Sequence, residues 1–237
     1  MDTKGKGAVI TGSTNGIGLA IAERMIAAGM DVVVSSRTAK KVKEIAQRLS
    51  GEGPGRAIGI ACDVRDSKSC AALIADGVDQ LGRLDVLVNN AGVGRMRPVH
   101  KMSLEEWSEQ IETNLNGVFY CSRAAVPYLS ATGDGWIINI GSLASRNSFA
   151  GGAAYNASKF GLLGMSEAMM LDLRNEGVRV SIVMPGSVQT DFGDFAGAKQ
   201  GWALHADDCA LAVMQLLEYP GRALVSRVEM RPTRPEK

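Results

Sequence analysis

Short apolar runs alternate with longer stretches of helical period along most of this chain. Six runs rich in apolar and β-branched residues predict strands at 8–10, 32–34, 57–60, 86–88, 137–140 and 180–183. Helical periodicity predicts helices at 17–28, 40–49, 67–81, 104–129 and 153–175, followed by a helix at 206–218 and a last strand at 223–230. Repeated βα units are typical of a parallel sheet, and the near-continuous hydrophobicity of the strands predicts burial of both their faces.

These elements predict an α/β fold, namely a single-domain, Rossmann-like, doubly wound and mostly parallel seven-stranded sheet with helices on both faces. We expect all 237 residues to belong to this one domain. The binding crevice of such a sheet lies outside the carboxyl ends of its strands. The segment at about 187–205 has no clear period but contains Phe192, Phe195 and Trp202, and it is interpreted as a cover over the substrate.

Composition and charge argue against several classes of protein. Hydrophobic residues make up 46% and charged residues 22%, and the formal net charge of +1 gives no reason to expect a nucleic-acid partner. The apolar runs stop short of the roughly 18 residues that a membrane helix needs, and residues 1–4 lead directly into a strand, so we expect a cytoplasmic protein without a membrane partner. The four cysteines lack Cys-x-x-Cys spacing, which predicts reduced, buried thiols and no metal site.

A glycine cluster joins the first predicted strand to the first predicted helix. Gly12, Gly16 and Gly18 allow a tight turn there, and they let backbone N–H groups approach a pyrophosphate at the helix start. The cofactor contacts expected from this turn are Gly12, Thr14, Asn15, Gly16, Ile17 and Gly18. Glycines can also serve turn geometry alone, but this placement favours phosphate binding, and the absence of a Gly-Lys-Ser/Thr ending argues against a nucleoside triphosphate loop.

The end of the second predicted strand indicates which dinucleotide would bind. An acidic residue there would accept the ribose 2′-hydroxyl of NAD, whereas this chain has Ser36 and Arg37, followed by Lys40 and Lys41. Arg37 can bind a phosphate through paired hydrogen bonds, and the Ser36 hydroxyl can add another. A solvated arginine at a strand end is the alternative, but the absent carboxylate favours NADP (NADPH).

Tyr155 and Lys159 are spaced i,i+4 on a predicted helix, and Ser142 precedes Tyr155 by thirteen residues. A phenol with a reference pKa of about 10 needs a nearby cation before it exchanges protons near neutral pH. At an effective dielectric constant of about 20, a cation about 4 Å away would stabilise the phenolate by about 4 kcal/mol, which is about three pKa units before desolvation is subtracted. The pattern therefore predicts a carbonyl-reducing nicotinamide site in which Lys159 lowers the pKa of Tyr155.

Together these motifs resemble the short-chain dehydrogenase/reductase family, in its order and approximate spacing over nearly the whole chain. They are Thr11-Gly-x-x-x-Gly-Ile-Gly18, Asn89-Asn-Ala-Gly92, Asn114, Ser142, Tyr155-x-x-x-Lys159, and Pro185-Gly186 with Thr190. The resemblance implies that Tyr155 is the general acid, that Ser142 orients the carbonyl oxygen, and that Lys159 also binds the nicotinamide ribose. It implies that Asn114 holds a water through which the proton is replenished.

The same resemblance extends the cofactor site. It implies that Asp63 with Val64 contacts the adenine, that Asn90, Ala91 and Gly92 line the adenosine ribose, and that Pro185, Gly186, Val188 and Thr190 shape the nicotinamide pocket. Tyr155 and Lys159 belong to the cofactor contacts as well. Asp63 has a competing interpretation as a helix cap, and Asn89 is interpreted as a structural clamp on the sheet.

The sequence gives weaker signals for the substrate and for the oligomeric state. Segments 95–97, 146–149 and 192–202 are expected to choose the substrate, with the aromatic residues of the cover either forming an apolar wall or packing on the sheet. Arg95 and Arg97 either attract an acidic group or are solvated. The family resemblance implies a homodimer or homotetramer in which 104–129 and 153–175 pair with their symmetry mates. The end of the chain departs from the glycine-rich ending of many family members, which leaves the usual tetramer contact open.

The leading hypothesis is an NADPH-dependent oxidoreductase that reduces a ketone or aldehyde, similar to 3-oxoacyl thioester reductases. The alternative enzyme is an NADP-dependent dehydrogenase of hydroxy acids, polyols or other secondary alcohols. A third possibility is a regulatory protein that senses NADP without turnover. The complete set of Asn114, Ser142, Tyr155 and Lys159 argues against the sensor, because binding alone needs no proton relay.

Overall fold

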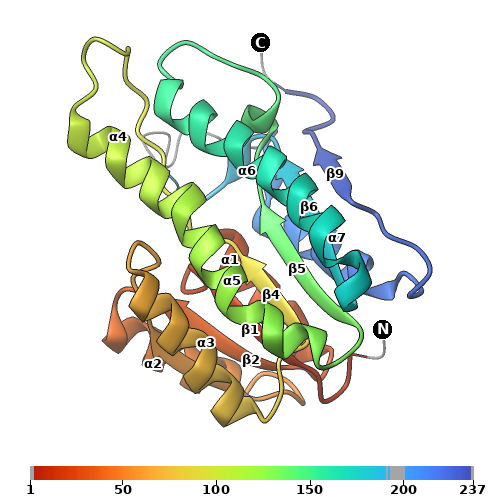
Figure 1. The fold of residues 1–237 in the computed structure, drawn as a ribbon. Helices are drawn as coiled ribbons and strands as arrows, with labels where there is room; N and C mark the ends of the chain where they lie inside the picture. Colours follow the sequence, from red (N-terminus) through yellow and green to blue (C-terminus); the bar gives the residue numbers. More distant parts are fainter. Residues whose placement is uncertain (1–2, 191, 193–200, 236–237) are drawn as a thin grey trace.

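A parallel sheet of seven strands runs through the protein (Figure 1), seen in a computed structural model that describes residues 3–190, 192 and 201–235. Its strand order is β3-β2-β1-β4-β5-β6-β9, and every neighbouring pair is parallel. The strands are β1 (Gly7–Thr11), β2 (Asp31–Ser36), β3 (Ala57–Ala61), β4 (Val86–Asn89), β5 (Gly135–Ile140), β6 (Val178–Pro185) and β9 (Arg227–Met230). The predicted doubly wound sheet is confirmed.

Helices cover both faces of the sheet because successive side chains of each strand point to opposite sides. Ala8 and Ile10 of β1 pack with residues of α1, α2 and α7, whereas Val9 packs with residues of α3, α5 and α6. The helices are α1 (Gly16–Ala27), α2 (Ala39–Leu49), α3 (Ser67–Leu81), α4 (Leu104–Ile111), α5 (Gly117–Ser130), α6 (Ala153–Leu173) and α7 (Ala206–Glu218). Short 3₁₀ turns are η2 (Leu143–Ser145) and η3 (Arg174–Glu176).

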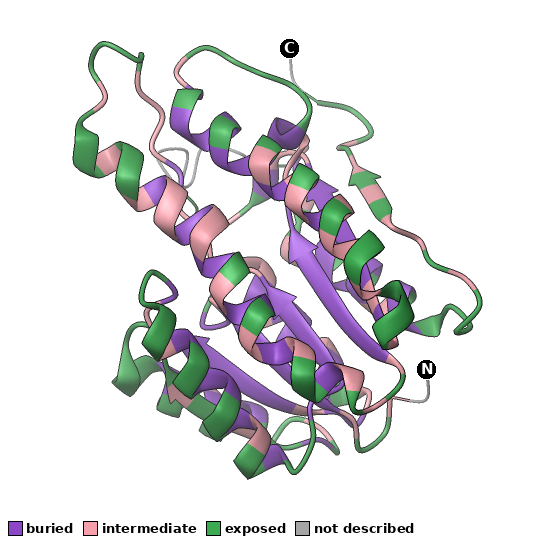
Figure 2. Cartoon of the chain, in the orientation of Figure 1, coloured by how far each residue is buried: buried purple, intermediate pink, exposed green. Residues whose placement is uncertain are grey.

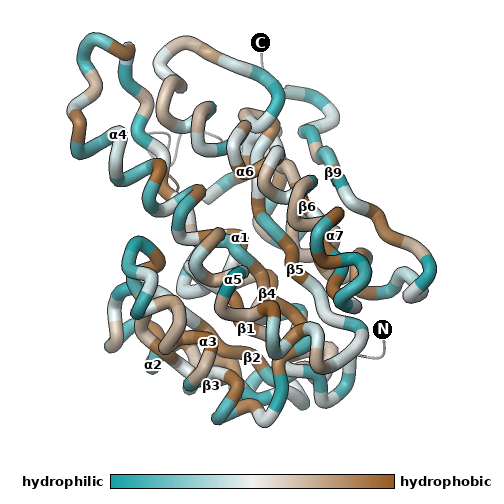
Figure 3. Tube along the Cα trace, in the orientation of Figure 1, coloured by the Kyte–Doolittle hydropathy of each residue, from teal (hydrophilic) through white to brown (hydrophobic). Residues whose placement is uncertain are grey.

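Burial follows the position of a strand in the sheet. The central strands β1, β4 and β5 are buried along their whole length, as predicted, and Figures 2 and 3 show them as the buried and apolar centre of the protein. The prediction is wrong for β3, whose residues are partly or fully exposed. At the sheet edge β3 has only one neighbouring strand, so helix packing alone shields it on its open side.

The predicted helix at 104–129 is interrupted. A π-helical turn, η1 (Glu112–Asn116), separates α4 from α5, although the three segments form one long rod across the front of Figure 1. Such a turn inserts one residue into the helix without changing its apolar pattern enough to be seen in the sequence. Directly after this turn, Gly117 packs closely against the loop between β3 and α3, since a Cβ at Gly117 would come within 2.9 Å of Val64.

Two further boundaries differ from the sequence prediction. The last strand begins at Arg227 rather than at residue 223, because Ala223 N donates to Pro220 O at 2.8 Å and closes a turn before it. The ends of the predicted cover pair as a small second sheet, β7 (Val188–Gln189) with β8 (Leu204–His205), which the sequence did not indicate. Most of the cover between them, including Phe195, lies outside the described residues.

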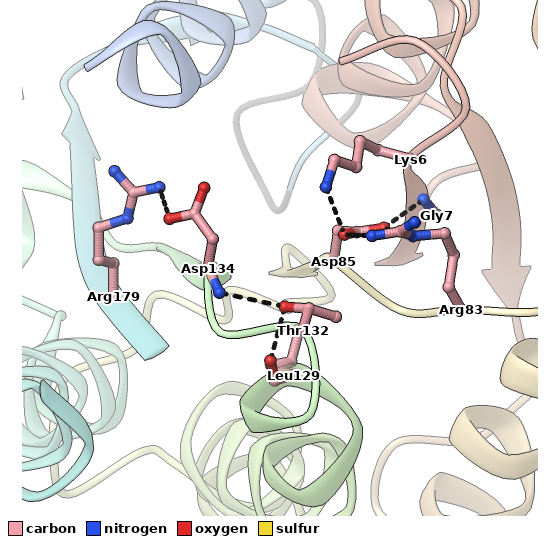
Figure 4. Close-up of polar contacts among 8 residues, drawn as sticks. All are labelled: Lys6, Gly7, Arg83, Asp85, Leu129, Thr132, Asp134 and Arg179. Atoms are coloured by element: carbon pink, nitrogen blue, oxygen red, sulfur yellow. Dashed lines mark hydrogen bonds and ion pairs between the residues drawn. The ribbon is translucent and has the colours of Figure 1, made fainter. Parts of the chain in front are cut away.

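The amino ends of the strands are held together by ion pairs (Figure 4). Asp85, which is fully buried, accepts from Lys6 Nζ at 3.1 Å, Arg83 Nε at 2.6 Å and Gly7 N at 2.9 Å. Arg179 of β6 pairs with Asp134 next to β5. These contacts fix the starts of β1, β4, β5 and β6.

Two sequence expectations concern the chain as a whole. All four cysteines are free and buried, as predicted. None of the helices within residues 3–190 and 201–235 is both long and apolar enough to cross a membrane.

Candidate active site

The residues predicted to bind a cofactor or to act in catalysis gather at one edge of the sheet. They follow the carboxyl ends of β1 to β6 or lie on η1 and α6 beside them. Because the strands are parallel, these ends share one edge, which is where doubly wound sheets bind ligands.

The glycine turn after β1 has a backbone that other residues adopt only with strain. Gly12 and Gly16 have φ values of 64° and 53°, in the left-handed region. A Cβ at Gly12 would lie 2.8 Å from Ala91 Cα, and one at Gly18 would lie 2.6 Å from Gly12 O. The turn therefore needs glycine both for its conformation and for its close contact with the segment after β4.

Asn90 holds the turn in place. Its Nδ2 donates to Thr11 O at 3.0 Å and to Gly12 O at 2.9 Å, while Thr11 Oγ1 accepts from the backbone N–H groups of Asn90 and Ala91, each at 3.1 Å. Thr11 was not among the predicted site residues. Its role requires a contact across about eighty residues of sequence, which no local motif reveals.

Helix α1 begins with free backbone donors. Asn15 is its N-cap but forms no side-chain cap hydrogen bond, and no acidic residue lies in the first turn. Such a helix start presents unpaired N–H groups and the positive end of the helix dipole, which together bind anions. Thr190 lies next to this turn, since a Cβ at Gly16 would come within 3.3 Å of its methyl carbon.

The end of β2 offers donors without an acceptor. The Oγ atom of Ser36 is buried and has no hydrogen-bond partner among the described residues. Arg37 is exposed, and within the described part of the chain it forms no ion pair. A buried hydroxyl without a partner is costly unless a ligand completes it. Ser36 and Arg37 therefore fit an anionic group bound at this strand end.

Asp63 does not cap helix α3, so that alternative is wrong. The cap is Asp66, whose carboxylate accepts from Lys68 N at 2.9 Å. Asp63 instead accepts from Arg65 Nη2 at 2.6 Å, and this hydrogen bond keeps the pKa of Asp63 below its usual value. Val64 is buried beside it. The adenine contacts of Asp63 and Val64 stay predictions.

The structure brings Ser142, Tyr155 and Lys159 together. Tyr155 and Lys159 lie one turn apart on α6, with 8% and 5% of their surfaces exposed. Lys159 Nζ lies 5.8 Å from the centre of the Tyr155 ring and donates to Ile140 O at 2.9 Å. Ser142 begins the η2 turn after β5 and is hydrogen-bonded to Tyr155.

The predicted lowering of the tyrosine pKa is wrong for the chain itself. Burial raises the pKa of Tyr155 to about 12, and the hydrogen bond with Ser142 offsets only part of that increase. Lys159 points its ammonium group at a backbone carbonyl, and burial lowers its own pKa to about 8. Desolvation of the phenolate therefore outweighs the attraction that the i,i+4 spacing suggested. The phenol keeps its proton at neutral pH, as a general acid requires.

Asn114 lies in the π turn η1, as close to the site as predicted, but its side chain has structural partners. Its Oδ1 accepts from Val93 N at 2.8 Å, and its Nδ2 donates to Val93 O at 2.9 Å and to Ser158 Oγ at 3.1 Å. Ser158 Oγ in turn donates to Tyr155 O at 2.8 Å. A water held by Asn114 would therefore donate a hydrogen bond to the main-chain carbonyl of Asn114, not to its side chain. Asn114 lies in a π turn, and such turns are frequent at functional sites.

Neighbouring loops lie beside Tyr155 at the position where the sequence predicted the substrate. Phe192 lies with its ring centre 6.0 Å from that of Tyr155. The side chains of Arg95 and Arg97 are 43% and 42% exposed, and their Nε atoms each lie 3.6 Å from a carboxylate oxygen of α4, on Glu109 and Glu106. Of the two alternatives, this exposure fits solvated arginines, each of which also has a carboxylate partner.

Asn89 is the structural clamp that the sequence predicted. It is buried, and its Nδ2 donates to Ser122 Oγ at 3.0 Å and to Asn139 Oδ1 at 2.9 Å. Asn139 Nδ2 donates onward to Ser166 Oγ at 2.8 Å. The chain of contacts ties β4 and β5 to α5 and α6 beneath the site.

Sequence reasoning missed two residues of the Tyr-Asn-Ala-Ser-Lys segment. Ser158 links Asn114 to the backbone of Tyr155, and Asn156 binds the loop after β5 through its side-chain amide. Both lie between the two residues that carry the known pattern. The signal that could have identified them is their polarity: they are polar side chains inside a predicted helix, between the two catalytic residues.

Comparison with known proteins gives one consistent result. Residues 6–201 match the family model described as short chain dehydrogenase. The 3-oxoacyl-(acyl-carrier-protein) reductase of Salmonella typhimurium is 36% identical over 191 residues, which cover 81% of this chain and 77% of that protein. The D-threitol dehydrogenase of Mycolicibacterium smegmatis is 35% identical over 189 residues, covering 80% and 72%. An alcohol dehydrogenase from the archaeon Thermococcus sibiricus, solved with 5-hydroxy-NADP, superimposes with a TM-score of 0.91 at 30% identity and covers 98% of this chain and 99% of its own.

Proposed function

Since the chain belongs to the short-chain dehydrogenase family and is an oxidoreductase, we propose that it uses NADPH to reduce a ketone or aldehyde to an alcohol, with a 3-oxoacyl thioester as one candidate substrate. The observation that carries this proposal is the buried group of Ser142, Tyr155 and Lys159, with Lys159 Nζ 5.8 Å from the Tyr155 ring. Binding alone requires no such arrangement of proton donors.

The proton on Tyr155 suits this residue to act as the acid in carbonyl reduction. With a pKa of about 12, the phenol is protonated throughout the neutral range, so it is ready to donate to a carbonyl oxygen as that oxygen gains negative charge. Ser142 binds the same oxygen and Lys159 supplies positive charge beside the tyrosine. Bound NADPH would supply the hydride. In the reverse direction the same residue would act as the general base.

NADPH is favoured over NADH by the groups at the end of β2. The unpartnered Ser36 Oγ and the exposed Arg37 suit a 2′-phosphate, and no carboxylate at this strand end would accept a 2′-hydroxyl. The pyrophosphate would lie at the start of α1, against Gly12 and Gly16. That an archaeal relative of similar fold was solved with 5-hydroxy-NADP is consistent with this choice.

An NADP-dependent dehydrogenase of polyols, hydroxy acids or other secondary alcohols is the second candidate. The 35% identity to a D-threitol dehydrogenase favours it. Beside the site, Arg95 is paired with Glu109 and Arg97 with Glu106, so these positions carry no net positive charge that would favour a strongly acidic substrate. Uncharged polyols and uncharged keto esters are therefore both suitable substrates.

We also propose that two or more copies associate through α5 and α6. Phe119 of α5 and Leu171 of α6 are 48% and 50% exposed, and both lie on the helices that the sequence predicted to pair. Phe119 and Val126 of α5 also line one surface groove with Met169 and Leu173 of α6, and a shared apolar surface of this kind is typical of an interface. Light scattering of the purified protein measures the number of copies directly.

The test of the function follows NADPH and NADH oxidation in parallel against acetoacetyl thioesters, uncharged β-keto esters, diketones and aldehydes. NADP reduction by polyols and secondary alcohols is measured in the same series. We expect turnover of at least one carbonyl class with NADPH and much slower turnover with NADH. Tight NADPH binding without turnover of any compound in either direction would favour the sensor, and turnover of alcohols alone would favour the dehydrogenase.

A further inference from the structure

The side chain of Asn156 joins the catalytic helix to the loop that carries Ser142. Its Nδ2 donates to Ala144 O at 2.8 Å and to Asn147 O at 3.0 Å, and its Oδ1 accepts from Phe149 N at 3.3 Å. Only 8% of the residue is exposed. The amide thus binds three backbone groups of a single loop, and the sequence predicted no role for it.

One of these contacts leads directly to the site. Ala144, whose carbonyl is held by Asn156, donates its own N–H to Ser142 Oγ at 3.1 Å. The peptide units on the two sides of Ala144 therefore connect the Asn156 amide to the Ser142 hydroxyl. Because Oγ accepts from Ala144, its proton is left to be donated toward Tyr155 or a substrate oxygen.

The chain makes room for this amide. A Cβ at Gly152 would lie 2.4 Å from Asn156 Oδ1, so a larger residue there would displace the side chain. Tyr155 and Asn156 are consecutive on α6 and point about 100° apart around the helix axis. One turn of the helix thus directs the phenol into the site and the amide toward the loop that places the serine.

We infer that Asn156 is a positioning residue for the reaction, which acts by fixing the Ser142 hydroxyl relative to the Tyr155 phenol. The inference rests on the proposed function, because it needs a reaction in which Ser142 takes part. It does not require Asn156 to touch the substrate or the cofactor. Loss of the amide should therefore affect the chemical step more than it affects the binding of NADPH.

Asn156→Ala tests this role, with Asn175→Ala as the matched control at an exposed asparagine just beyond the end of α6. Misplacement of a catalytic group by about 1 Å can lower the rate about 100-fold, so we expect kcat to fall about 10- to 100-fold. The Kd of NADPH, measured by fluorescence titration, should stay within about twofold of the wild-type value. Asn175→Ala should change neither quantity.

A double-mutant comparison identifies the residue through which Asn156 acts. In a Ser142→Ala background, Asn156→Ala should lower the residual kcat less than about twofold, because the group it positions is already absent. If that residual rate is too small to measure, the separation of kcat from Kd decides alone. Asn156→Ser, which keeps one donor, serves as a second variant and should retain more activity than Asn156→Ala.

The outcomes separate this inference from the function on which it rests. A wild-type protein that turns over no carbonyl or alcohol overturns the proposed function. An active wild type with a fully active Asn156→Ala variant, with kcat and NADPH affinity lost together, or with additive effects of the two substitutions overturns the positioning role. Failure of both Asn156 variants to fold would assign the residue to stability alone and would equally overturn it.

Discussion

The two ends of the parallel sheet each bury a charged side chain, but they differ in how many partners that side chain has. At the amino end, Asp85 is surrounded by donors from Lys6, Arg83 and Gly7 (Figure 4). At the carboxyl end, Lys159 is almost as deeply buried but meets one backbone carbonyl, and no carboxylate of the described residues lies within 4 Å of it. One end compensates its charge fully and the other leaves it largely uncompensated.

The pKa shifts express this difference. Burial opposes ionisation of Asp85, but the hydrogen bonds from Arg83, Gly7 and Lys6 outweigh it and hold the pKa of that carboxyl below its usual range. Burial lowers the pKa of Lys159 to about 8. A lowered pKa favours the charged form of a carboxylic acid such as Asp85, whereas it favours the neutral form of an amine such as Lys159. The amino end thus stabilises the fold, whereas the carboxyl end retains groups whose protonation state a ligand can change.

The largest effect is expected at the carboxyl end, where Tyr155→Phe removes only the hydroxyl. Loss of a general acid lowers rates by about 10²- to 10⁴-fold, so carbonyl reduction should fall at least about 100-fold. NADPH binding and the urea midpoint of unfolding should remain close to wild type, because the ring still packs against its neighbours. Reduction at more than a tenth of the wild-type rate would remove Tyr155 from the role of acid.

Asp85→Ala should do the reverse, lowering stability while leaving the activity of each folded molecule nearly unchanged. Breaking a buried ion pair costs about 3–5 kcal/mol, and the partial exposure of Lys6 and Arg83 favours the lower value, because water can solvate them. Urea unfolding at pH 7 measures the loss. Arg83→Ala leaves Asp85 with two partners and should cost less.

A large fall of kcat in the folded Asp85→Ala protein, beside its loss of stability, would show that the two ends of the sheet are not separate in function. Equal losses from Arg83→Ala and Asp85→Ala would show that the carboxylate depends on Arg83 alone. The first result would contradict the separation of the two ends, and the second would contradict the description of the amino end as a shared cluster.

Sequence patterns predicted the carboxyl end better than the amino end. The glycine turn and the Tyr155–Lys159 pair are local, with spacings fixed by one turn of backbone or helix, so they can be recognised without coordinates. Lys6 and Asp85 are 79 residues apart, and nothing in the sequence near either residue marks their contact. Their pairing depends on β1 and β4 being neighbours in the sheet.

Energetic quantities at the site were also beyond the sequence. The i,i+4 spacing correctly placed Lys159 beside Tyr155, but the sign of the tyrosine pKa shift depends on how much water both groups lose. The π turn at Asn114 and the hydrogen bonds of Asn156 depend in the same way on packing between α4, α5 and α6. Local pattern identified the participants, and the tertiary structure determined their protonation and orientation.

Arg37→Asp should have an intermediate effect, on the choice of cofactor. The substitution replaces a cation that suits the 2′-phosphate by an anion that repels it and can accept a ribose hydroxyl. We expect the ratio of kcat/KM for NADPH to that for NADH to fall about 100-fold, which is about 2.7 kcal/mol. Lys43→Asp, an equal change of charge at an exposed position of α2, should leave the ratio within about twofold. An unchanged ratio in Arg37→Asp would show that Arg37 does not bind the 2′-phosphate at the end of β2.

The smallest expected effect tests whether the charge of Lys159 is uncompensated within the chain. Its pKa is about 8 in the folded protein and about 10.4 when unfolded, so the unfolded state binds more protons between these values. The contribution of Lys159 to the free energy of unfolding should therefore rise with pH in this window, by about 2 kcal/mol between pH 8 and pH 9.5. Tyr155, whose pKa is raised, contributes a loss only above about pH 10. The pKa values of the Cys62, Cys70 and Cys209 thiols are raised as well, and these groups lower the free energy of unfolding within the window, so the contribution of Lys159 has to be measured as a difference from a variant that keeps the cysteines.

Lys159→Met removes this contribution and keeps an apolar stem of similar length in the site. Urea unfolding of both proteins without cofactor should show the variant more stable than the wild type at pH 8, with an advantage that shrinks by about 2 kcal/mol as the pH approaches 9.5. A constant difference between the two proteins would mean that the charge of Lys159 is already balanced, as that of Asp85 is. The contrast between the two ends of the sheet would then lie in catalysis alone and not in the energetics of the folded chain.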